Sequence, residues 1–191
     1  MHTIRSFIAI PLSNQVARSA TRLVERLSAP GDGIRWVPLD NLHLTLKFLG
    51  DVDNTEVPQV CNIIRNITKD FEPFDLDFAG AGGFPNLERP RVLCVHIDDP
   101  SNSLSRIVAR LEDELAAIGF KPEPRDYVPH LTLGRTKSGS RRASGDVIDR
   151  VKANTEMKLG QMNVDTVQLI ASFLEKQGPS YQVMDTIELG E

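Results

Sequence analysis

Apolar residues recur along this chain with two spacings, one typical of amphipathic helices and one typical of β-strands. The helical spacing places residues three and four positions apart on one buried face, and capping residues stand next to each such segment. It predicts helices over Asn14–Leu27 after the N-cap Ser13, over Thr55–Lys69, from a cap at Ser101 or Ser103 to Gly119, and near Asp146–Ala153.

Short β-prone runs bounded by proline, glycine and polar residues lie between these helices. The loop GAGGFPNLERP separates two of the runs, EKQGPS joins the last two, and the polar, basic stretch 136–145 is expected to be a mobile loop. The expected strands are Ile4–Ile10, Arg35–Val37, Leu42–Leu49, Phe74–Ala79, Arg91–Ile97, His130–Leu133, and segments near Glu156–Leu159, Val164–Ser172 and Tyr181–Leu189.

The tetrapeptide HLTL occurs twice, at residues 43–46 and 130–133. A strand begins 38 residues before each copy, at Arg5 and at Val92, and a long amphipathic helix and a short loop then lead to HLTL. A turn, a helix and a strand follow both copies. This order predicts an internally duplicated α+β unit, in which two halves pack about an approximate twofold axis and bring the two HLTL strands opposite each other.

Side chains alternate across a strand, so the histidine and threonine of HLTL share one face and both leucines share the other. We therefore expect the four leucines to enter the core. His43 and Thr45 should face His130 and Thr132 across one cleft, and Lys47 continues the His43 face if the strand stays regular.

Two histidines with pKa values near 6.5 can act as a general acid and a general base, and two hydroxyls can bind phosphate oxygens. Neither tetrapeptide contains a carboxylate, so a hydrolytic metal site would be short of ligands, and no nucleophile elbow is evident. A single HLTL is ordinary strand composition. A second identical copy at the same place in a repeat favours metal-independent acid–base catalysis on a phosphodiester.

Composition narrows the class of protein further. The chain has 191 residues and a net charge of −4, which suits one domain or two small lobes and argues against a general nucleic-acid coat protein. Its two cysteines, Cys61 and Cys94, lie in apolar runs and are expected to be buried thiols. The sequence contains neither a signal peptide pattern nor an apolar stretch long enough to span a membrane, so we expect a cytoplasmic protein.

Taken together, these motifs resemble the 2H phosphoesterase superfamily, and within it the bacterial RNA 2′,3′-cyclic phosphodiesterases, also called 2′-5′ RNA ligase-like proteins. The similarity extends over nearly the whole chain and includes RSFIAIPL, IRWVPLDNLHLTLKFLGDV, GAGGFPNLERPRVL, VPHLTLGR and VQLIASFLEKQGPSYQVM. The resemblance implies a single domain, residues 1–191, of two intertwined lobes. Each lobe is an antiparallel sheet flanked by helices and contributes one motif to a central cleft.

The resemblance also implies an activity and its residues. The activity is hydrolysis of an RNA 2′,3′-cyclic phosphate end to a 2′-phosphomonoester, with 2′-5′ ligation as the possible reverse reaction. His43 would be the proton donor and His130 the proton acceptor, while Thr45, Thr132 and Arg135 would bind the substrate. Neither metal nor cofactor is implied, the partner is an RNA end, and a monomer is expected.

Several other residues have a second interpretation. Lys47 and Arg5 could line the cleft, Trp36 is expected to pack in the core rather than stack on a base, and the basic loop 137–142 could attract RNA. The glycines of Gly80–Gly83 lack the spacing of a phosphate-binding loop. Two alternatives to the RNA-end enzyme stay open: a phosphodiesterase for a small cyclic or 2′-5′ linked nucleotide, and a non-catalytic module that binds RNA ends.

Overall fold

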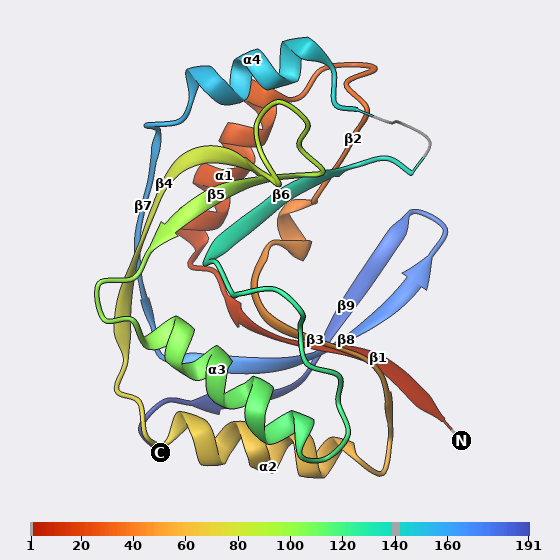
Figure 1. The fold of residues 1–191 in the computed structure, drawn as a ribbon, viewed down its shortest axis with the longest axis vertical. Coiled ribbons are helices and arrows are strands. Elements are labelled where there is room, and N and C mark those ends of the chain that lie inside the picture. Colours follow the sequence, from red (N-terminus) through yellow and green to blue (C-terminus); the bar gives the residue numbers. More distant parts are fainter. Residues whose placement is uncertain (1, 139–141) are drawn as a thin grey trace.

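The computed structural model describes residues 2–138 and 142–191 as an α+β fold (Figure 1). The helices are α1 (Asn14–Leu27), α2 (Val57–Thr68), α3 (Ser103–Ala116) and α4 (Gly145–Ala153), with a 3-10 turn at Leu39–Asn41. The strands are β1 (Thr3–Pro11), β2 (Ile34–Trp36), β3 (His43–Asp53), β4 (Phe74–Phe84), β5 (Val92–Asp98), β6 (His130–Thr136), β7 (Lys158–Val164), β8 (Thr166–Glu175) and β9 (Gly178–Glu188).

The strands form two antiparallel sheets, as the resemblance implied. One has the order β3-β1-β8-β9 and the other the order β2-β6-β5-β4-β7. The first HLTL segment begins β3 in the four-stranded sheet, and the second begins β6 in the five-stranded sheet. The two motifs therefore reach the site from different sheets.

The helices are exchanged between the two halves of the chain (Figure 1). Helix α1, from the first half, packs against β7 and α4 beside the five-stranded sheet. Helix α3, from the second half, packs against α2 and β3 beside the four-stranded sheet. Each sheet is thus covered by one helix from the first half of the chain and one from the second.

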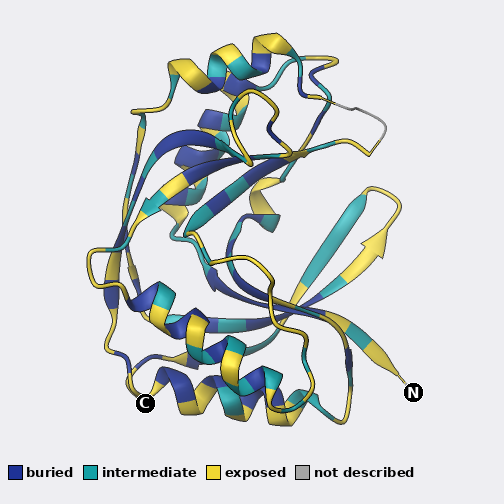
Figure 2. Cartoon of the chain, in the orientation of Figure 1, coloured by how far each residue is buried: buried dark blue, intermediate teal, exposed yellow. Residues whose placement is uncertain are grey.

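The leucines of both HLTL segments enter the hydrophobic core, as the alternation predicted. Leu44, Leu46, Leu131 and Leu133 are all buried, and burying one leucine side chain stabilises the fold by roughly 1.5–3 kcal/mol. Figure 2 shows buried positions running along the central strands and along the inner faces of the helices. The opposite faces of the same strands can therefore carry polar side chains.

Helix boundaries follow the capping residues. Helix α1 spans the predicted Asn14–Leu27, because the Ser13 hydroxyl accepts the Val16 amide at 3.2 Å. Helix α3 begins after Asn102, whose backbone is left-handed and whose side chain makes no capping bond. The Ser101 hydroxyl and the Asp99 carboxylate accept the first-turn amides instead.

The prediction that residues 80–90 form a loop is wrong for their first part. Strand β4 continues through Gly80–Gly83 to Phe84, and β5 pairs with it at Asp77 and Phe78 and again, after a register shift, from Ala81 to Phe84. Gly80 has a φ of +86°, and a Cβ at this position would lie 2.5 Å from the Thr155 carbonyl oxygen. The glycines extend the strand because they allow a close approach that a side chain would block.

Other strand boundaries also differ from the sequence predictions. Strand β3 runs on to Asp53 and β7 covers Lys158–Val164 rather than Glu156–Leu159, while the β8–β9 hairpin turns within residues 175–178. Part of the expected mobile loop 136–145 belongs to β6 and α4, and residues 139–141 lie outside the described residues.

The two cysteines are free and buried, as expected. Within residues 2–138 and 142–191, the helices are too short or too polar to cross a membrane.

Candidate active site

The two motif histidines are held in the same way. His43 is the first residue of β3, and its Nδ1 lies 3.1 Å from the Asn41 carbonyl oxygen. His130 is the first residue of β6, and its Nδ1 lies 2.7 Å from the Val128 carbonyl oxygen. A carbonyl oxygen only accepts hydrogen bonds, so each Nδ1 carries the proton and donates it. In both rings Nε2 is then the atom left for chemistry.

A β-bulge follows each threonine, at the last leucine of each HLTL. On β3, Thr45 pairs with Ala9 and Lys47 with Ile8, which leaves Leu46 unpaired. On β6, Thr132 pairs with Cys94 and Gly134 with Leu93, which leaves Leu133 unpaired. A bulge of this kind reverses the face of every residue that follows it. The duplicated halves therefore share an irregularity at the same motif position.

The suggestion that Lys47 lines the cleft is confirmed, although the strand is not regular at this position. Lys47 does not continue the face of His43 and Thr45, because the bulge turns it toward α3. Its ammonium donates to Glu112 Oε2 at 2.7 Å and to the Lys121 carbonyl oxygen at 3.2 Å. Lys47 thus borders the cleft, but its ammonium is paired with groups of the protein itself.

The second bulge returns Arg135 to the face that carries His130 and Thr132. Gly134 takes the opposite face, where a Cβ would lie 2.7 Å from Ile34 and 2.9 Å from Trp36. Trp36 packs against the core, as predicted, and its indole donates to Asp32 at 2.8 Å.

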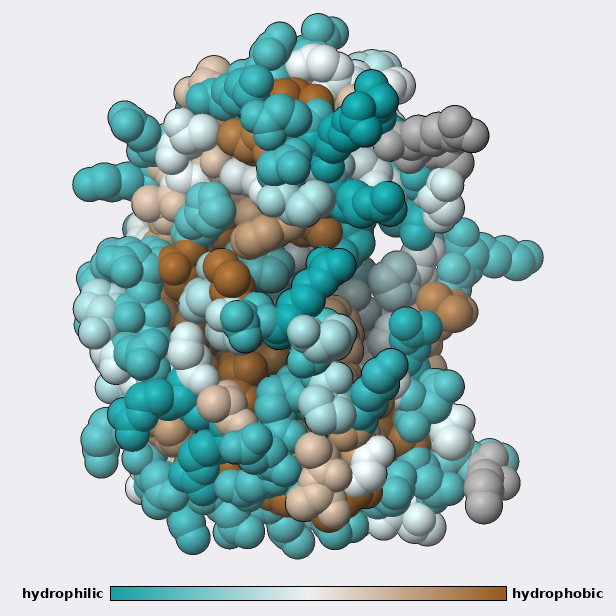
Figure 3. All heavy atoms as spheres, viewed as in Figure 1, coloured by the Kyte–Doolittle hydropathy of each residue, from teal (hydrophilic) through white to brown (hydrophobic). Residues whose placement is uncertain are grey.

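One cleft of about 700 Å³ brings together all five residues that the sequence analysis assigned to the site. His43 and Thr45 line it from β3, and His130, Thr132 and Arg135 line it from β6. The space-filling view shows the surface hollowed between the two sheets (Figure 3). The remaining lining residues are Leu46, Lys47, Phe48, Phe84, Val92, Ser105, Val108, Ala109, Glu112, Glu123, Arg125, Asp126, Tyr127 and Val128.

Aromatic side chains that the sequence analysis did not single out surround the motif histidines. Tyr181 of β9 lies edge-on to His43, with ring centroids 5.7 Å apart, and Phe7 lies 5.0 Å from Tyr181. Phe48, 60% exposed, packs on Phe7 from the cleft side. In the other sheet, the ring centroids of Phe84 and His130 lie 4.8 Å apart. Aligning HLTLKF with HLTLGR would have matched Phe48 with Arg135, whereas no sequence signal marks Tyr181.

His96 is a further neighbour of the second motif. It lies in the middle of the five-stranded sheet, directly opposite His130 across the β5–β6 pair, and not at a sheet edge. Its imidazole covers Gly82 so closely that a Cβ at Gly82 would overlap it. Phe84 contacts both rings, at 6.2 Å from His96. The rings of Phe84, His96 and His130 therefore lie together at this end of the cleft.

The two histidines have different electrostatic surroundings. Burial lowers the pKa of His43, and the hydrogen bond to Asn41 opposes this effect. Burial also lowers the pKa of His130 against the hydrogen bond to Val128, and the nearby charges of Arg135 and His96 lower this pKa further. Burial and neighbouring charges both favour the neutral form of His130, whereas burial alone favours the neutral form of His43.

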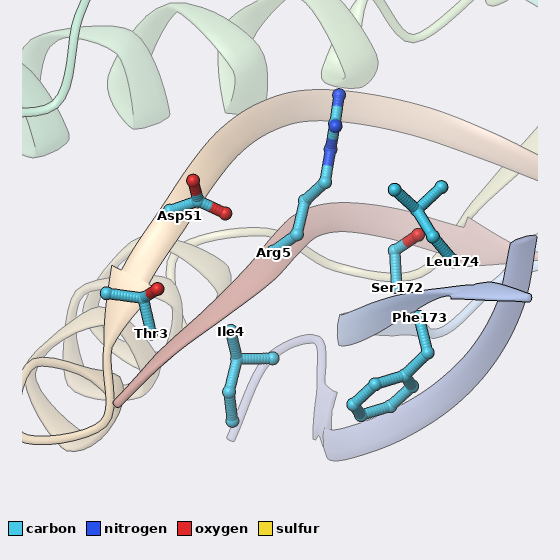
Figure 4. Close-up of a pocket in the computed structure, with 7 residues that line it drawn as sticks. All are labelled: Thr3, Ile4, Arg5, Asp51, Ser172, Phe173 and Leu174. Carbon is cyan, nitrogen blue, oxygen red and sulfur yellow. The ribbon is translucent and has the colours of Figure 1, made fainter. Parts of the chain in front are cut away.

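Arg5 lies outside the lining of this cleft. It lines a smaller pocket of about 360 Å³ between β1, β3 and β8, where its register partner is Asp51 (Figure 4). Its suggested place in the cleft is therefore wrong.

Side chains of both charges line the cleft. Among residues 2–138 and 142–191, no group of three or more His, Cys, Asp or Glu side chains is placed to hold a metal ion. The threonine hydroxyls and the Arg135 guanidinium are groups that bind anions, and the carboxylates of Glu112, Glu123 and Asp126 also belong to the lining.

Comparison with known proteins places these features in a family. The model of the family "LigT like Phosphoesterase" matches the chain twice, at residues 10–94 and 95–181. An RNA 2′,3′-cyclic phosphodiesterase of Methanothermobacter thermautotrophicus is 33% identical over 97% of this chain and 99% of its own length. One from Aquifex aeolicus is 29% identical over the whole of both chains. The crystal structure of a Thermus thermophilus protein matches with a TM-score of 0.79 and 26% identity over 98% of each chain.

Proposed function

Because this chain belongs to the family of LigT-like phosphoesterases, we propose that it hydrolyses RNA 2′,3′-cyclic phosphate ends to 2′-phosphomonoesters. The observation that carries the proposal is the pair of motif histidines, each with Nδ1 fixed by a backbone carbonyl and Nε2 left free beside one cleft. Two such groups meet the need of a phosphodiesterase for one base and one acid.

The surroundings of the histidines support different roles for them. His130 lies near Arg135, whose positive charge disfavours an imidazolium, so it suits the proton acceptor. His43 is surrounded by the rings of Phe7 and Tyr181 and has no such cationic neighbour among the causes of its lowered pKa, so it suits the proton donor. This assignment agrees with the roles that the family resemblance implied.

The proposed reaction uses the two Nε2 atoms in turn. Water attacks the phosphorus in line with the bond to the 3′ oxygen and gives its proton to His130 Nε2. The 3′ oxygen leaves with a proton from His43 Nε2, and the phosphate stays on the 2′ oxygen. The hydroxyls of Thr45 and Thr132 donate to the non-bridging oxygens, and Arg135 adds positive charge at the outer end of β6.

The test is turnover of a short RNA that ends in a 2′,3′-cyclic phosphate, with identification of the terminal phosphate in the product. The wild type should yield the 2′-phosphate. His43→Ala and His130→Ala should each lose at least about a hundredfold in kcat, because general acid–base catalysis contributes roughly 10²–10⁴ per group.

His2→Ala serves as the control, because His2 is exposed and lies outside the cleft. Tight binding of the RNA without turnover by the wild type would contradict the proposal and would favour a module that only binds RNA ends.

A further inference from the structure

The chain itself orients the carbonyl group that holds His130. Val128 supplies this carbonyl oxygen, and Pro129 stands between the two residues. The proline ring fixes its own φ and restricts the preceding residue to an extended backbone, so the Val128 carbonyl has little freedom to turn away. The corresponding position before His43 is occupied by Leu42, which imposes neither restriction. The carbonyl that holds His43 must therefore be fixed in another way.

Asn41, which supplies that carbonyl, ends the 3-10 turn Leu39–Asn41. None of the three residues of the turn is buried, and Leu39 is 45% exposed. Hydrogen-bond geometry in a 3-10 turn is poorer than in an α-helix, and little packing compensates for it here. The backbone of the turn is thus weakly held by its own contacts.

The side chain of Asn41 joins the turn to a distant segment of the chain. Its amide Nδ2 donates to the Pro179 carbonyl oxygen at 2.8 Å, across 138 positions of sequence. Pro179 lies at the beginning of β9, in the β8–β9 hairpin that projects from the four-stranded sheet (Figure 1). Tyr181, further along β9, lies edge-on to His43, with ring centroids 5.7 Å apart. The hairpin therefore reaches His43 in two ways, through the Asn41 amide and through the ring of Tyr181.

The end of this hairpin has little packing of its own. From Gly178 to Thr186, β9 contains no buried residue. Phe173 and Leu174, near the end of β8, are 44% and 81% exposed. Loss of the Asn41 amide would therefore loosen the turn and the end of the hairpin together.

We propose that Asn41 is a positioning residue for the proton donor His43. Its side chain fastens the turn to Pro179, so that its backbone carbonyl holds the Nδ1–H of His43 and leaves Nε2 for the substrate. Asn41 is not among the residues that line the cleft, so it acts on the substrate only through His43. The inference rests on the proposed function for the role of His43, whereas the tautomer of His43 can be measured without any substrate.

The first measurement is the ¹⁵N NMR spectrum of the imidazoles in the wild type and in Asn41→Ala, without substrate and at a pH where the rings are neutral. His43→Gln and His130→Gln assign the signals. In the wild type, both rings should carry the proton on Nδ1. In Asn41→Ala, His43 should become a mixture of the two tautomers, whereas His130 should be unchanged. A wild-type His43 protonated on Nε2, or an unchanged His43 in Asn41→Ala, would overturn the proposal.

The second measurement is the kinetics with an RNA that ends in a 2′,3′-cyclic phosphate. In Asn41→Ala, kcat should fall roughly ten- to hundredfold with little change in KM, because a misplaced acid weakens the transition state rather than the binding of substrate. Asn41→Gln keeps an amide donor and should recover part of this loss. A rise in KM with an unchanged kcat would contradict the positioning role.

The matched control is Asn163→Ala. Asn163 is exposed on β7, and its amide also joins distant segments by donating to Asp75 Oδ1 at 2.9 Å. It lies outside the lining of the cleft, so this variant should keep the wild-type kcat and the wild-type tautomers. An equal loss of kcat in Asn163→Ala would mean that Asn41 only supports the fold. If the wild type cleaves no cyclic-phosphate RNA, the proposed function fails, while the tautomer of His43 still decides whether Asn41 positions this ring.

Discussion

The ammonium of Lys47 and the carboxylate of Glu112 form a salt bridge of 2.7 Å, with the Lys47 side chain 2% exposed and the Glu112 side chain 21% exposed. The same Glu112 oxygen accepts the amide of Glu123 at 3.0 Å, and Lys47 also donates to the Lys121 carbonyl oxygen. The pair therefore joins β3 and α3 to the segment that enters β6 at His130.

Removing either partner of this salt bridge should have unequal effects on stability. Glu112→Ala leaves a buried ammonium without a counter-charge, so we expect a loss of about 3–5 kcal/mol in the free energy of unfolding. Lys47→Met leaves a carboxylate that still reaches solvent and keeps the Glu123 amide, so its loss should be smaller. Urea denaturation measures both. The control Asp70→Asn breaks an exposed pair with Arg110 and should cost at most about 1 kcal/mol. Equal losses in the free energy of unfolding for Glu112→Ala and Lys47→Met would contradict this account.

The pH dependence of activity should reflect the lowered pKa values of both histidines. The base must be neutral and the acid protonated, so kcat/KM rises with pH as His130 loses its proton and falls as His43 loses its own. Because both pKa values lie below the usual 6.5, the maximum of kcat/KM should lie on the acidic side of neutrality.

His96→Gln provides a sharper test of the same idea. It removes a neighbouring imidazole whose electrostatic effect lowers the pKa of His130, so the rising limb of kcat/KM should move to higher pH. The falling limb should stay in place, since His96 is not among the groups that shift the pKa of His43. His2→Gln is the control, and an unmoved rising limb would mean that the charge of His96 does not act on the base.

Two glycines of β4 should differ in their tolerance of alanine. Gly80→Ala forces a side chain into a left-handed backbone conformation and against the Thr155 carbonyl, so a loss of roughly 1–3 kcal/mol or more is expected. Gly82→Ala only displaces the exposed imidazole of His96, so its loss should be under about 1 kcal/mol, and adding His96→Ala should reduce it further. Thermal or urea unfolding of the three variants decides the order, and a larger loss for Gly82→Ala would refute the argument.

Activity should not depend on a divalent metal ion. Neither motif supplies a carboxylate, and among residues 2–138 and 142–191 no group of three or more His, Cys, Asp or Glu side chains is placed to hold a metal ion. We expect kcat/KM for the cyclic-phosphate RNA to be the same with and without EDTA. A loss in EDTA that Mg²⁺, Mn²⁺ or Zn²⁺ restores would show that the two-histidine mechanism is incomplete.

The sequence predicted the elements whose signal is local. The apolar spacing and the Ser13 cap predicted α1 to the residue, and the repeated tetrapeptide identified both histidines and the faces of the four leucines. What it missed depends on strand pairing between distant segments. The bulge at Leu46 arises where β3 meets β1, and this pairing turns Lys47 off the face of His43 and Thr45 and toward Glu112. Tyr181 reaches His43 only because β9 extends the β1–β8 sheet, and the glycines of β4 resemble a loop until their close neighbours are known.

The exchange of α1 and α3 between the two sheets makes the two halves of the chain depend on each other. Each half supplies a helix that packs beside the sheet carrying the other half's motif, as protomers do in a domain-swapped dimer. The two halves nevertheless differ at the position that follows each bulge on the cleft face, which is Phe48 in one half and Arg135 in the other. This difference gives the pseudosymmetric cleft two unlike ends, and therefore a direction in which a polar chain can bind.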